Sequence, residues 1–232
     1  IEIELGTEIN DDINIYIRGI ESAVLEAELD YSDVDIYTAG DYQMYVNIGN
    51  KSIPYDVKVI DTVAPEIEVN QEIEYVATER EYDVNYFISK VTDLSDTSEV
   101  HFKIDDELQD TITFDAPGEY TLTFVAKDIS DNETEETTTI IAETPPQFMG
   151  LADMTIPVGA DYDYTQYFFA YDETDGFITD NVTIDTKRVD FSREGTYEIT
   201  YSVVNSHGID NRKTITITTE ENATDDYIYN TN

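Results

Sequence analysis

Apolar and polar residues alternate along much of the chain, and this period of two predicts β-strands. The clearest segments are Tyr42–Val46, Tyr120–Val125 and Tyr197–Val203, each of which opens on the tyrosine of a Gly-x-Tyr sequence. Apolar residues stand six and four positions before each of these glycines, so they would share one face of a preceding strand. The pattern therefore predicts the same unit of strand, turn and strand three times.

The three glycines, Gly40, Gly118 and Gly195, follow one another at almost equal spacing along the chain. A period this regular predicts three copies of one small domain, and it argues against a single active site built from the whole chain. A glycine at this corner suits a tight turn with positive φ. The tyrosine two residues later can bury its ring while its hydroxyl bonds to nearby backbone, as in a tyrosine corner.

Prolines mark the expected domain boundaries, because proline has no N–H for a β-ladder and suits the start of an edge strand. Pro65 and Pro146 stand at the starts of similar segments, separated by about the same period as the glycines. Linkers this short favour an elongated rod. We therefore expect three repeats and a polar exit linker, over residues 1–61, 62–144, 145–220 and 221–232.

The third repeat reads as about seven short strands with turns between them. Residues 164–170 are expected to form a strand whose aromatic side chains fill the core, and residues 172–176 a turn. In the first repeat, residues 20–29 could form one or two helical turns or another strand, and analogy with the other repeats favours a strand.

Acidic residues dominate the composition, with 52 Asp and Glu against 12 Lys and Arg and a net charge of −40. Such a surface repels phosphate backbones and anionic membranes, so we expect neither nucleic acid nor lipid as a partner. The charge suits divalent cations and basic surfaces, or it simply keeps an extended protein soluble. No apolar run approaches the ~20 residues that span a bilayer, so membrane insertion is not expected. The absence of cysteine excludes disulfides and thiolate chemistry.

Three motifs together resemble a known family. They are the start Ala64-Pro65-Glu66-Ile67, the turn Ala170-x-Asp172-x-x-Asp175-Gly176-x-Ile178-Thr179, and the strand end Ala126-x-Asp128-x-x-Asp131-Asn132. The chain resembles the bacterial immunoglobulin-like repeats of cell-surface and secreted proteins, including HYR-type repeats, over nearly its whole length. The resemblance implies an all-β fold of three tandem immunoglobulin-like β-sandwich domains that form an elongated rod.

The same resemblance implies a non-catalytic stalk, spacer or adhesion region, located outside the cell, on the cell wall or on the cell surface. Its partner would be an unknown surface protein or a glycan. The chain starts directly on a strand, without an initiator methionine or a signal peptide, so we expect a monomeric fragment of a longer protein. His101 and His207 fall in different repeats without a nucleophile or phosphate-loop motif, so no catalytic residue is expected.

Calcium is the one cofactor that the residues suggest. Asp172 and Asp175, with Asp180 nearby, could offer carboxylate oxygens to Ca²⁺. The alternative is an Asx turn, in which these side chains cap backbone amides and Gly176 takes positive φ. A second candidate lies at a domain junction, where Asp61 and Glu66 could meet the loop acids Asp128 or Asp131.

Carbohydrate or protein binding, as a module accessory to a surface enzyme, is the alternative function. Tyr171, Tyr162 and Tyr164 are the candidates for an aromatic sugar platform. Most tyrosines, however, alternate in phase with apolar strand positions, so packing in the core or between strands explains them better.

Overall fold

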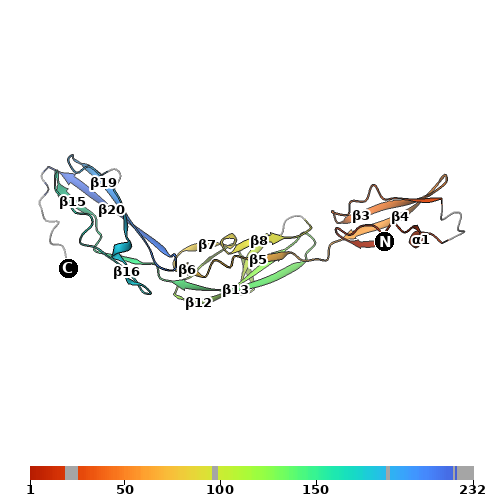
Figure 1. Cartoon of the computed structure of the whole chain (residues 1–232), viewed down its shortest axis with the longest axis horizontal. Coiled ribbons are helices and arrows are strands. Elements are labelled where there is room, and N and C mark those ends of the chain that lie inside the picture. The colour runs from red at the N-terminus through yellow and green to blue at the C-terminus, as the bar shows by residue number, and fades with distance from the viewer. Residues whose placement is uncertain (19–25, 96–98, 187–188, 222, 224–232) are drawn as a thin grey trace. The chain divides into compact units, whose positions relative to one another are not determined.

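The computed structural model describes residues 1–18, 26–95, 99–186, 189–221 and 223. Within these ranges the chain is almost entirely β, with twenty strands, one short α-helix, α1 (Ile13–Tyr16), and two 3-10 turns, η1 (Val84–Tyr86) and η2 (Thr179–Asn181) (Figure 1). The all-β prediction is confirmed. The residues group into two compact units, and the count of three domains remains a prediction.

Unit 1 contains residues Ile1–Gln71, Asp83–Ile112 and Leu122–Thr138, and unit 2 contains Glu72–Tyr82, Thr113–Thr121 and Thr139–Asn232. The chain passes from one unit to the other within four strands. These are β7 (Glu81–Asp83), β11 (Thr111–Thr113), β12 (Gly118–Lys127) and β13 (Glu133–Glu143).

Unit 1 opens with a four-stranded sheet in the order β1-β4-β3-β2. Strands β3 (Gly40–Ile48) and β4 (Lys51–Ile60) form an antiparallel hairpin, β1 (Glu2–Glu4) joins β4 in parallel, and β2 (Ala27–Asp30) lies antiparallel to β3. The predicted strand in residues 20–29 is therefore present at its end, while residues 20–25 lie outside the described residues.

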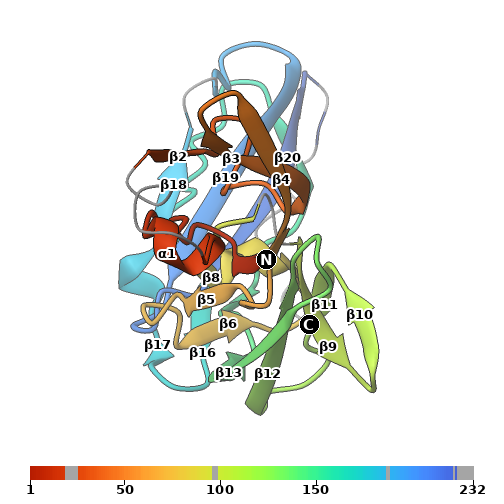
Figure 2. The ribbon, with the colours of Figure 1, turned by 90° about the vertical axis from the view of Figure 1, so that its right-hand side faces the viewer.

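The rest of unit 1 pairs β5 (Glu66–Val69) with β8 (Ile88–Thr92), and places β9 (Glu99–Ile104) between β10 (Glu107–Gln109) and β12. Figure 2 shows β9, β10 and β12 side by side. The rings of Phe87, Phe102 and Phe124 are fully buried here, with centroids 5.6 to 6.3 Å apart. Buried aromatic pairs at this separation add stabilisation beyond the apolar area that they bury.

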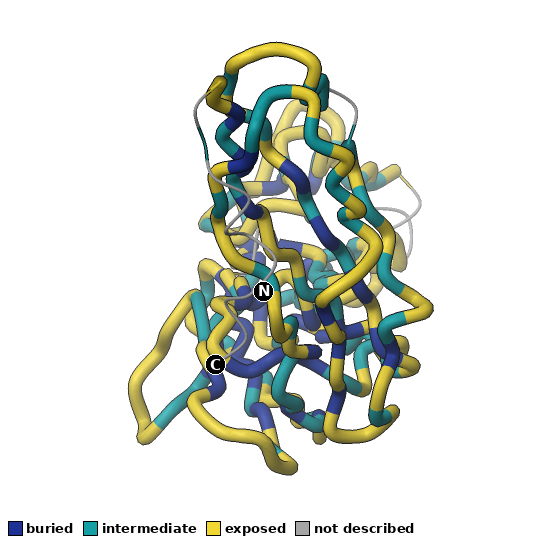
Figure 3. The backbone as a smooth tube through the Cα atoms, turned by 90° about the vertical axis from the view of Figure 1, so that its left-hand side faces the viewer, coloured by how far each residue is buried: buried dark blue, intermediate teal, exposed yellow. Residues whose placement is uncertain are grey.

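Unit 2 contains a short parallel pair between β6 (Tyr75–Ala77) and the end of β13, and two larger sheets. One sheet has the order β14-β16-β17, with bounds Gln147–Met149, Phe169–Asp172 and Gly176–Phe177. The other has the order β15-β20-β19-β18, with bounds Met154–Pro157, Asp210–Glu220, Gly195–Val204 and Thr183–Asp185. Buried positions alternate with more exposed ones along β19 and along the second half of β20. Figure 3 shows buried and exposed positions interspersed along the backbone.

The core of unit 2 centres on Tyr201, which is fully buried among apolar side chains and donates its hydroxyl to the Tyr164 carbonyl at 3.0 Å. Burial raises the pKa of Tyr201. The strand predicted over residues 164–170 is wrong for most of its length, because β16 begins only at Phe169. Asp163 accepts the Thr165 amide at 2.9 Å and Tyr167 takes φ +67°, so local turn bonds override the apolar alternation.

The tyrosine corner is confirmed in all three Gly-x-Tyr sequences. Each hydroxyl donates to the carbonyl four residues earlier, with distances of 2.8, 2.8 and 3.2 Å for Tyr42, Tyr120 and Tyr197. Gly40 and Gly195 do not have positive φ. A Cβ on Gly195 would lie 3.0 Å from the Tyr197 hydroxyl oxygen, so a larger residue there would push against the ring that folds back over it.

Candidate metal centre

Asp61, Asp93 and Asp128 come together in unit 1, where one carboxylate oxygen of each lies within 4.8 Å of the other two. These residues directly follow β4, β8 and β12, so three strand ends that are distant in sequence meet here. No other group of three acidic or histidine side chains in the described ranges comes this close.

Short loops fix two of the three carboxylates through hydrogen bonds from their own backbone. Asp128 Oδ1 accepts the amides of Ser130 and Asn132, both at 2.8 Å. Asp93 Oδ1 accepts the Ser95 amide at 2.7 Å and the Ser95 hydroxyl at 2.6 Å. These are Asx turns, which hold an aspartate side chain in place without help from a distant partner.

Asn132 joins the loop after β12 to the segment after β4. Its side-chain amide donates to Asp128 Oδ2 at 2.8 Å and to the Asp61 carbonyl at 3.1 Å. The position of Asp61 beside Asp128 is therefore set by protein hydrogen bonds.

Asp61 carries an oxygen without a partner. The residue is 9% exposed, and its Oδ1 accepts the Val63 amide at 3.3 Å. Its Oδ2 is buried and unpaired, and among the residues that the structure describes no other buried side-chain nitrogen or oxygen is left so. Leaving a buried polar atom unsatisfied costs about 1–3 kcal/mol, and more when the group is charged.

The charge of the cluster is not balanced by the nearest lysine in sequence. Lys127 pairs with Asp131 at 2.8 Å, and that pairing lowers the pKa of Asp131. Two negative charges about 5 Å apart repel by roughly 3 kcal/mol at an effective dielectric constant of about 20. Three carboxylates around a buried, unpaired oxygen form an arrangement that a hard cation with oxygen ligands could neutralise.

The sequence placed part of this cluster correctly. It predicted that Asp61 could meet Asp128, and the two do lie together. Glu66, by contrast, is exposed on β5, and Asp131 points to Lys127. Asp93 was missed, although it precedes Gly118 by nearly the same interval as Asp172 precedes Gly195.

Unit 2 has an equivalent pair of turns with different chemistry. Asn205 follows Gly195 by ten positions, as Asp128 follows Gly118. Its Oδ1 accepts amides two and four residues later, as Asp128 Oδ1 does. Its Nδ2 then donates to Asp172 Oδ2 at 3.2 Å. An amide in unit 2 therefore satisfies the aspartate that faces it, whereas unit 1 places a second carboxylate at this position.

The other predicted calcium ligands lie around this turn of unit 2. Asp172 Oδ1 accepts the amides of Thr174 and Asp175, and Asp175 accepts the Ser206 amide and hydroxyl at 2.6 and 2.7 Å. Gly176 has φ +76°, as expected for the Asx-turn alternative. Asp180 belongs to η2 and is not buried. The calcium prediction for Asp172, Asp175 and Asp180 remains a prediction.

The two histidines each face a carboxylate. His101 Nδ1 lies 2.7 Å from Asp110 Oδ1 in unit 1. His207 Nδ1 lies 2.9 Å from Glu143 Oε2 in unit 2, and its ring stacks on Tyr75 at 3.8 Å. The hydrogen bond with Glu143 raises the pKa of His207.

We expect the stability of the protein to fall as the pH rises above 6.5, in a way that depends on His207. Because its folded pKa lies above the ordinary 6.5, protonated His207 adds stability that is complete below pH 6.5 and is lost as the pH rises through the folded pKa. Urea unfolding across this pH range measures the effect. His207→Gln and Glu143→Gln should each remove it, and a pH dependence that survives both substitutions would contradict the assignment.

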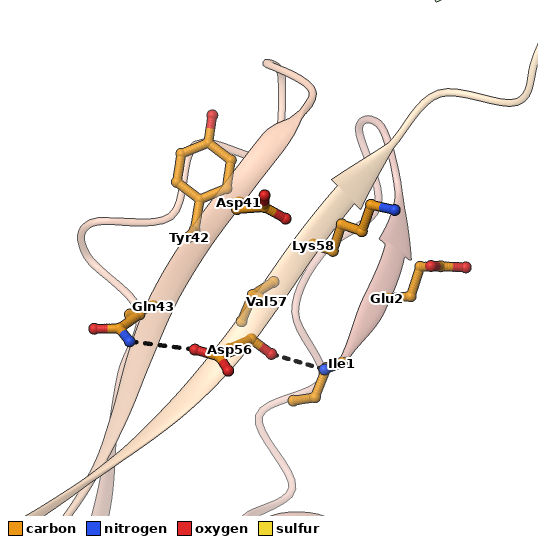
Figure 4. Close-up of a pocket in the computed structure, with 8 residues that line it drawn as sticks. All are labelled: Ile1, Glu2, Asp41, Tyr42, Gln43, Asp56, Val57 and Lys58. Carbon is orange, nitrogen blue, oxygen red and sulfur yellow. Dashed lines mark hydrogen bonds between the residues drawn. The ribbon is translucent and has the colours of Figure 1, made fainter.

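A groove in unit 1 lies between β1, β3 and β4 (Figure 4). Its polar groups bond to one another, with Gln43 Nε2 donating to Asp56 Oδ1 at 3.2 Å and the Ile1 amino group donating to the Asp56 carbonyl at 2.7 Å. The lining sets Lys58 among acids and holds no serine or histidine.

No helix among the described residues is long and apolar enough to cross a membrane.

The three tyrosines that were predicted to bind sugar differ in exposure. Tyr162 and Tyr164 pack against the core of unit 2, while the Tyr171 side chain is exposed on β16.

Comparison with known proteins finds a family match and a curated relative. Residues 146–219 match the family of the bacterial surface protein Ig-like domain. A segment of 76 residues is 36% identical to the pesticidal crystal protein Cry22Aa of Bacillus thuringiensis, which amounts to 31% of this chain and 10% of that protein. The chain thus spans about a tenth of the length of this curated relative.

Solved structures give weaker likenesses. The structure of CBM51-2 in complex with GlcNAc and INT domains from Clostridium perfringens ZmpB is 26% identical, over 32% of this chain and 16% of that chain, with a TM-score of 0.29. Protocadherin gamma C5 EC1-3 is 10% identical, over 94% of this chain and 98% of that chain, also with a TM-score of 0.29. TM-scores this low support no inference about function or shared architecture.

The family match confirms the immunoglobulin-like fold and the extracellular or cell-surface location that the sequence motifs predicted. It covers β14 to β19 and nearly all of β20. Residues 146–219, about a third of the chain, therefore match the bacterial surface protein Ig-like domain family.

Proposed function

We propose that this chain is a non-catalytic spacer region of a bacterial surface protein, and that one Ca²⁺ bound by Asp61, Asp93 and Asp128 holds the segment after β4 against two loops of unit 1. The observation that carries the proposal is the buried, unpaired Oδ2 of Asp61 next to two further carboxylates. A cation supplies the partner that this oxygen lacks and offsets the repulsion among three charges.

Calcium suits this site better than magnesium because of its coordination chemistry. Ca²⁺ takes six to eight oxygens in a flexible arrangement, whereas Mg²⁺ demands a near-ideal octahedron and gives up its water reluctantly. The three aspartate oxygens lie within 4.8 Å of one another and come from three separate strand ends, a set that a flexible coordination sphere can accept. Water and nearby carbonyl oxygens would complete the six to eight ligands that calcium takes.

The ion would serve the spacer by tying down its linker. Residues 61–63 already accept two hydrogen bonds from Asn132, but both come from one side chain. A metal bond to Asp61 adds a strong link from this segment to the loops of Asp93 and Asp128. Because the site forms only when these loops are folded, calcium would also stabilise the folded state.

Isothermal titration calorimetry with the full chain tests the proposal. We expect one Ca²⁺ per chain, weaker binding of Mg²⁺, and loss of calcium binding in Asp93→Asn. Asp131→Asn is the matched control, because it removes one charge from the loop that carries Asp128 but leaves the three ligands in place. Absence of a calcium signal in the parent, or equal binding by Asp93→Asn, would refute the site.

Adhesion is the second candidate function. The observation that favours it is a set of exposed aromatic side chains on the β14-β16-β17 sheet, at a distance in sequence from the three aspartates.

A further inference from the structure

One face of the β14-β16-β17 sheet exposes a cluster of large apolar side chains, here named the aromatic face. Phe177 is 71% exposed, Phe169 57%, Met149 45% and Tyr171 39%. They are neighbours across the sheet, because Met149 pairs with Phe169 and Tyr171 pairs with Phe177 in the strand register. Clustered exposed apolar side chains of this size mark interaction sites more often than single exposed residues do.

The opposite face of the same strands is the packed one. Phe148 lies against the core of unit 2, and Ala170 is fully buried. The alternation of a strand therefore explains why Phe169 and Tyr171 point outward, but it does not explain why both are aromatic. A polar residue at either position would leave the core unchanged.

The three rings do not form a flat platform. Phe177 lies 6.1 Å from Phe169 with an interplanar angle of 67°, and 5.4 Å from Tyr171 with an angle of 69°. Rings set at steep angles to one another present their electron-rich faces in different directions. This arrangement suits a compact cation approached from several sides better than a flat sugar ring stacked on coplanar aromatics.

The sequence around the aromatic face is mostly acidic. Residues 145–186 contain eight Asp or Glu and no Lys or Arg, two basic residues follow at 187 and 188, and the whole chain carries a net charge of −40. The turn between β16 and β17 contributes Glu173 and Asp175. A cation that approaches these rings is therefore attracted by the surrounding field as well as by the ring faces.

We propose that the aromatic face binds a lysine- or arginine-rich segment of a partner protein. The charge complementarity selects this occupant over a second copy of the chain, because two copies that each carry a charge of −40 repel one another. The basic side chains bind on the rings of Phe169, Tyr171 and Phe177, while the acids nearby hold the remaining charges of the segment. This inference concerns unit 2 and does not depend on the calcium site in unit 1.

The test uses a synthetic peptide of alternating lysine and glycine as the probe, with the full chain at physiological ionic strength. The acidic surface binds such a peptide weakly everywhere, so the comparison must keep the net charge constant. Phe177→Leu together with Phe169→Leu does so, and it also keeps the surface apolar. Tyr37→Leu is the matched control, because Tyr37 is an exposed aromatic residue of unit 1.

We expect the double substitution to weaken peptide binding about three- to tenfold and the control to leave it unchanged, the size expected when one or two cation–π contacts are lost. NMR signals of the three rings should shift on addition of the peptide. Equal affinity in the parent and the double variant would overturn the proposal by assigning the binding to charge alone. Ring shifts with N-acetylglucosamine oligomers but not with the peptide would overturn it in favour of a glycan. A melting temperature unchanged by the substitutions verifies the fold.

Discussion

Asp61→Asn is expected to stabilise the calcium-free protein and, at the same time, to abolish the stabilisation that calcium gives the parent chain. Without an ion, the substitution removes a buried charge whose Oδ2 has no partner, and the new amide can donate to the facing carboxylates. We expect a gain of about 1–3 kcal/mol in the free energy of unfolding. With calcium at about 100 times its dissociation constant, the parent should gain about 2.7 kcal/mol and the variant nothing.

Urea unfolding in chelator and in calcium gives, for each protein, the free energy of unfolding without the ion and the gain in stability that calcium adds. Asp131→Asn provides the comparison, because this side chain pairs with Lys127 rather than with the cluster and should keep the calcium response of the parent. The opposite sign in chelator, with Asp61→Asn less stable than the parent, would mean that the protein itself satisfies the carboxylate, and the calcium proposal would then fail.

The two units supply an internal comparison that supports placing the cation in unit 1. In both, an Asx turn fixes one aspartate, Asp93 or Asp172, and a second turn after a long strand places a side chain opposite it. Unit 2 uses Asn205, whose amide donates to Asp172, and unit 1 uses Asp128. A carboxylate in place of this amide changes a satisfied pair into a repelling one, and a cation would relieve the repulsion.

Much of the fold follows from local patterns in the sequence. The Gly-x-Tyr spacing predicted three similar corners, and each tyrosine makes the same bond to the carbonyl four residues earlier. The prediction was wrong over residues 164–168, where apolar alternation indicated a strand but Asp163 caps a turn. Side-chain bonds to the backbone of this kind leave no trace in a hydrophobic pattern.

The candidate site was less accessible from sequence, because it depends on which strand ends meet. Asp61 and Asp128 could be proposed as partners, since a linker and a loop at the same end of a sandwich lie near each other. Asp93 was not proposed as a ligand, although its spacing from Gly118 is close to that of Asp172 from Gly195, because its turn lacks the glycine that marks the turn at Asp172. The unpaired oxygen of Asp61 is a property of packing, and no sequence pattern predicts it.

Asp172→Ala is expected to lower the free energy of unfolding by about 2–3 kcal/mol, because a nearly buried carboxylate with three hydrogen bonds is lost. Asp172 is 3% exposed, and its removal takes away the acceptor of the Asn205 side-chain amide. Asp180 belongs to the same predicted set of calcium ligands but is not buried, so Asp180→Ala should change the stability little.

Chemical denaturation of Asp172→Ala in chelator and in calcium also decides between the two interpretations of this turn. An Asx turn that accepts only from its own backbone and from Asn205 predicts the same loss of stability under both conditions. A loss of stability that is seen in calcium but not in chelator, and that Asp175→Ala also shows, would instead assign Asp172 and Asp175 to a cation site. Because the three bonds to Asp172 all come from protein groups, we expect the loss to be independent of calcium.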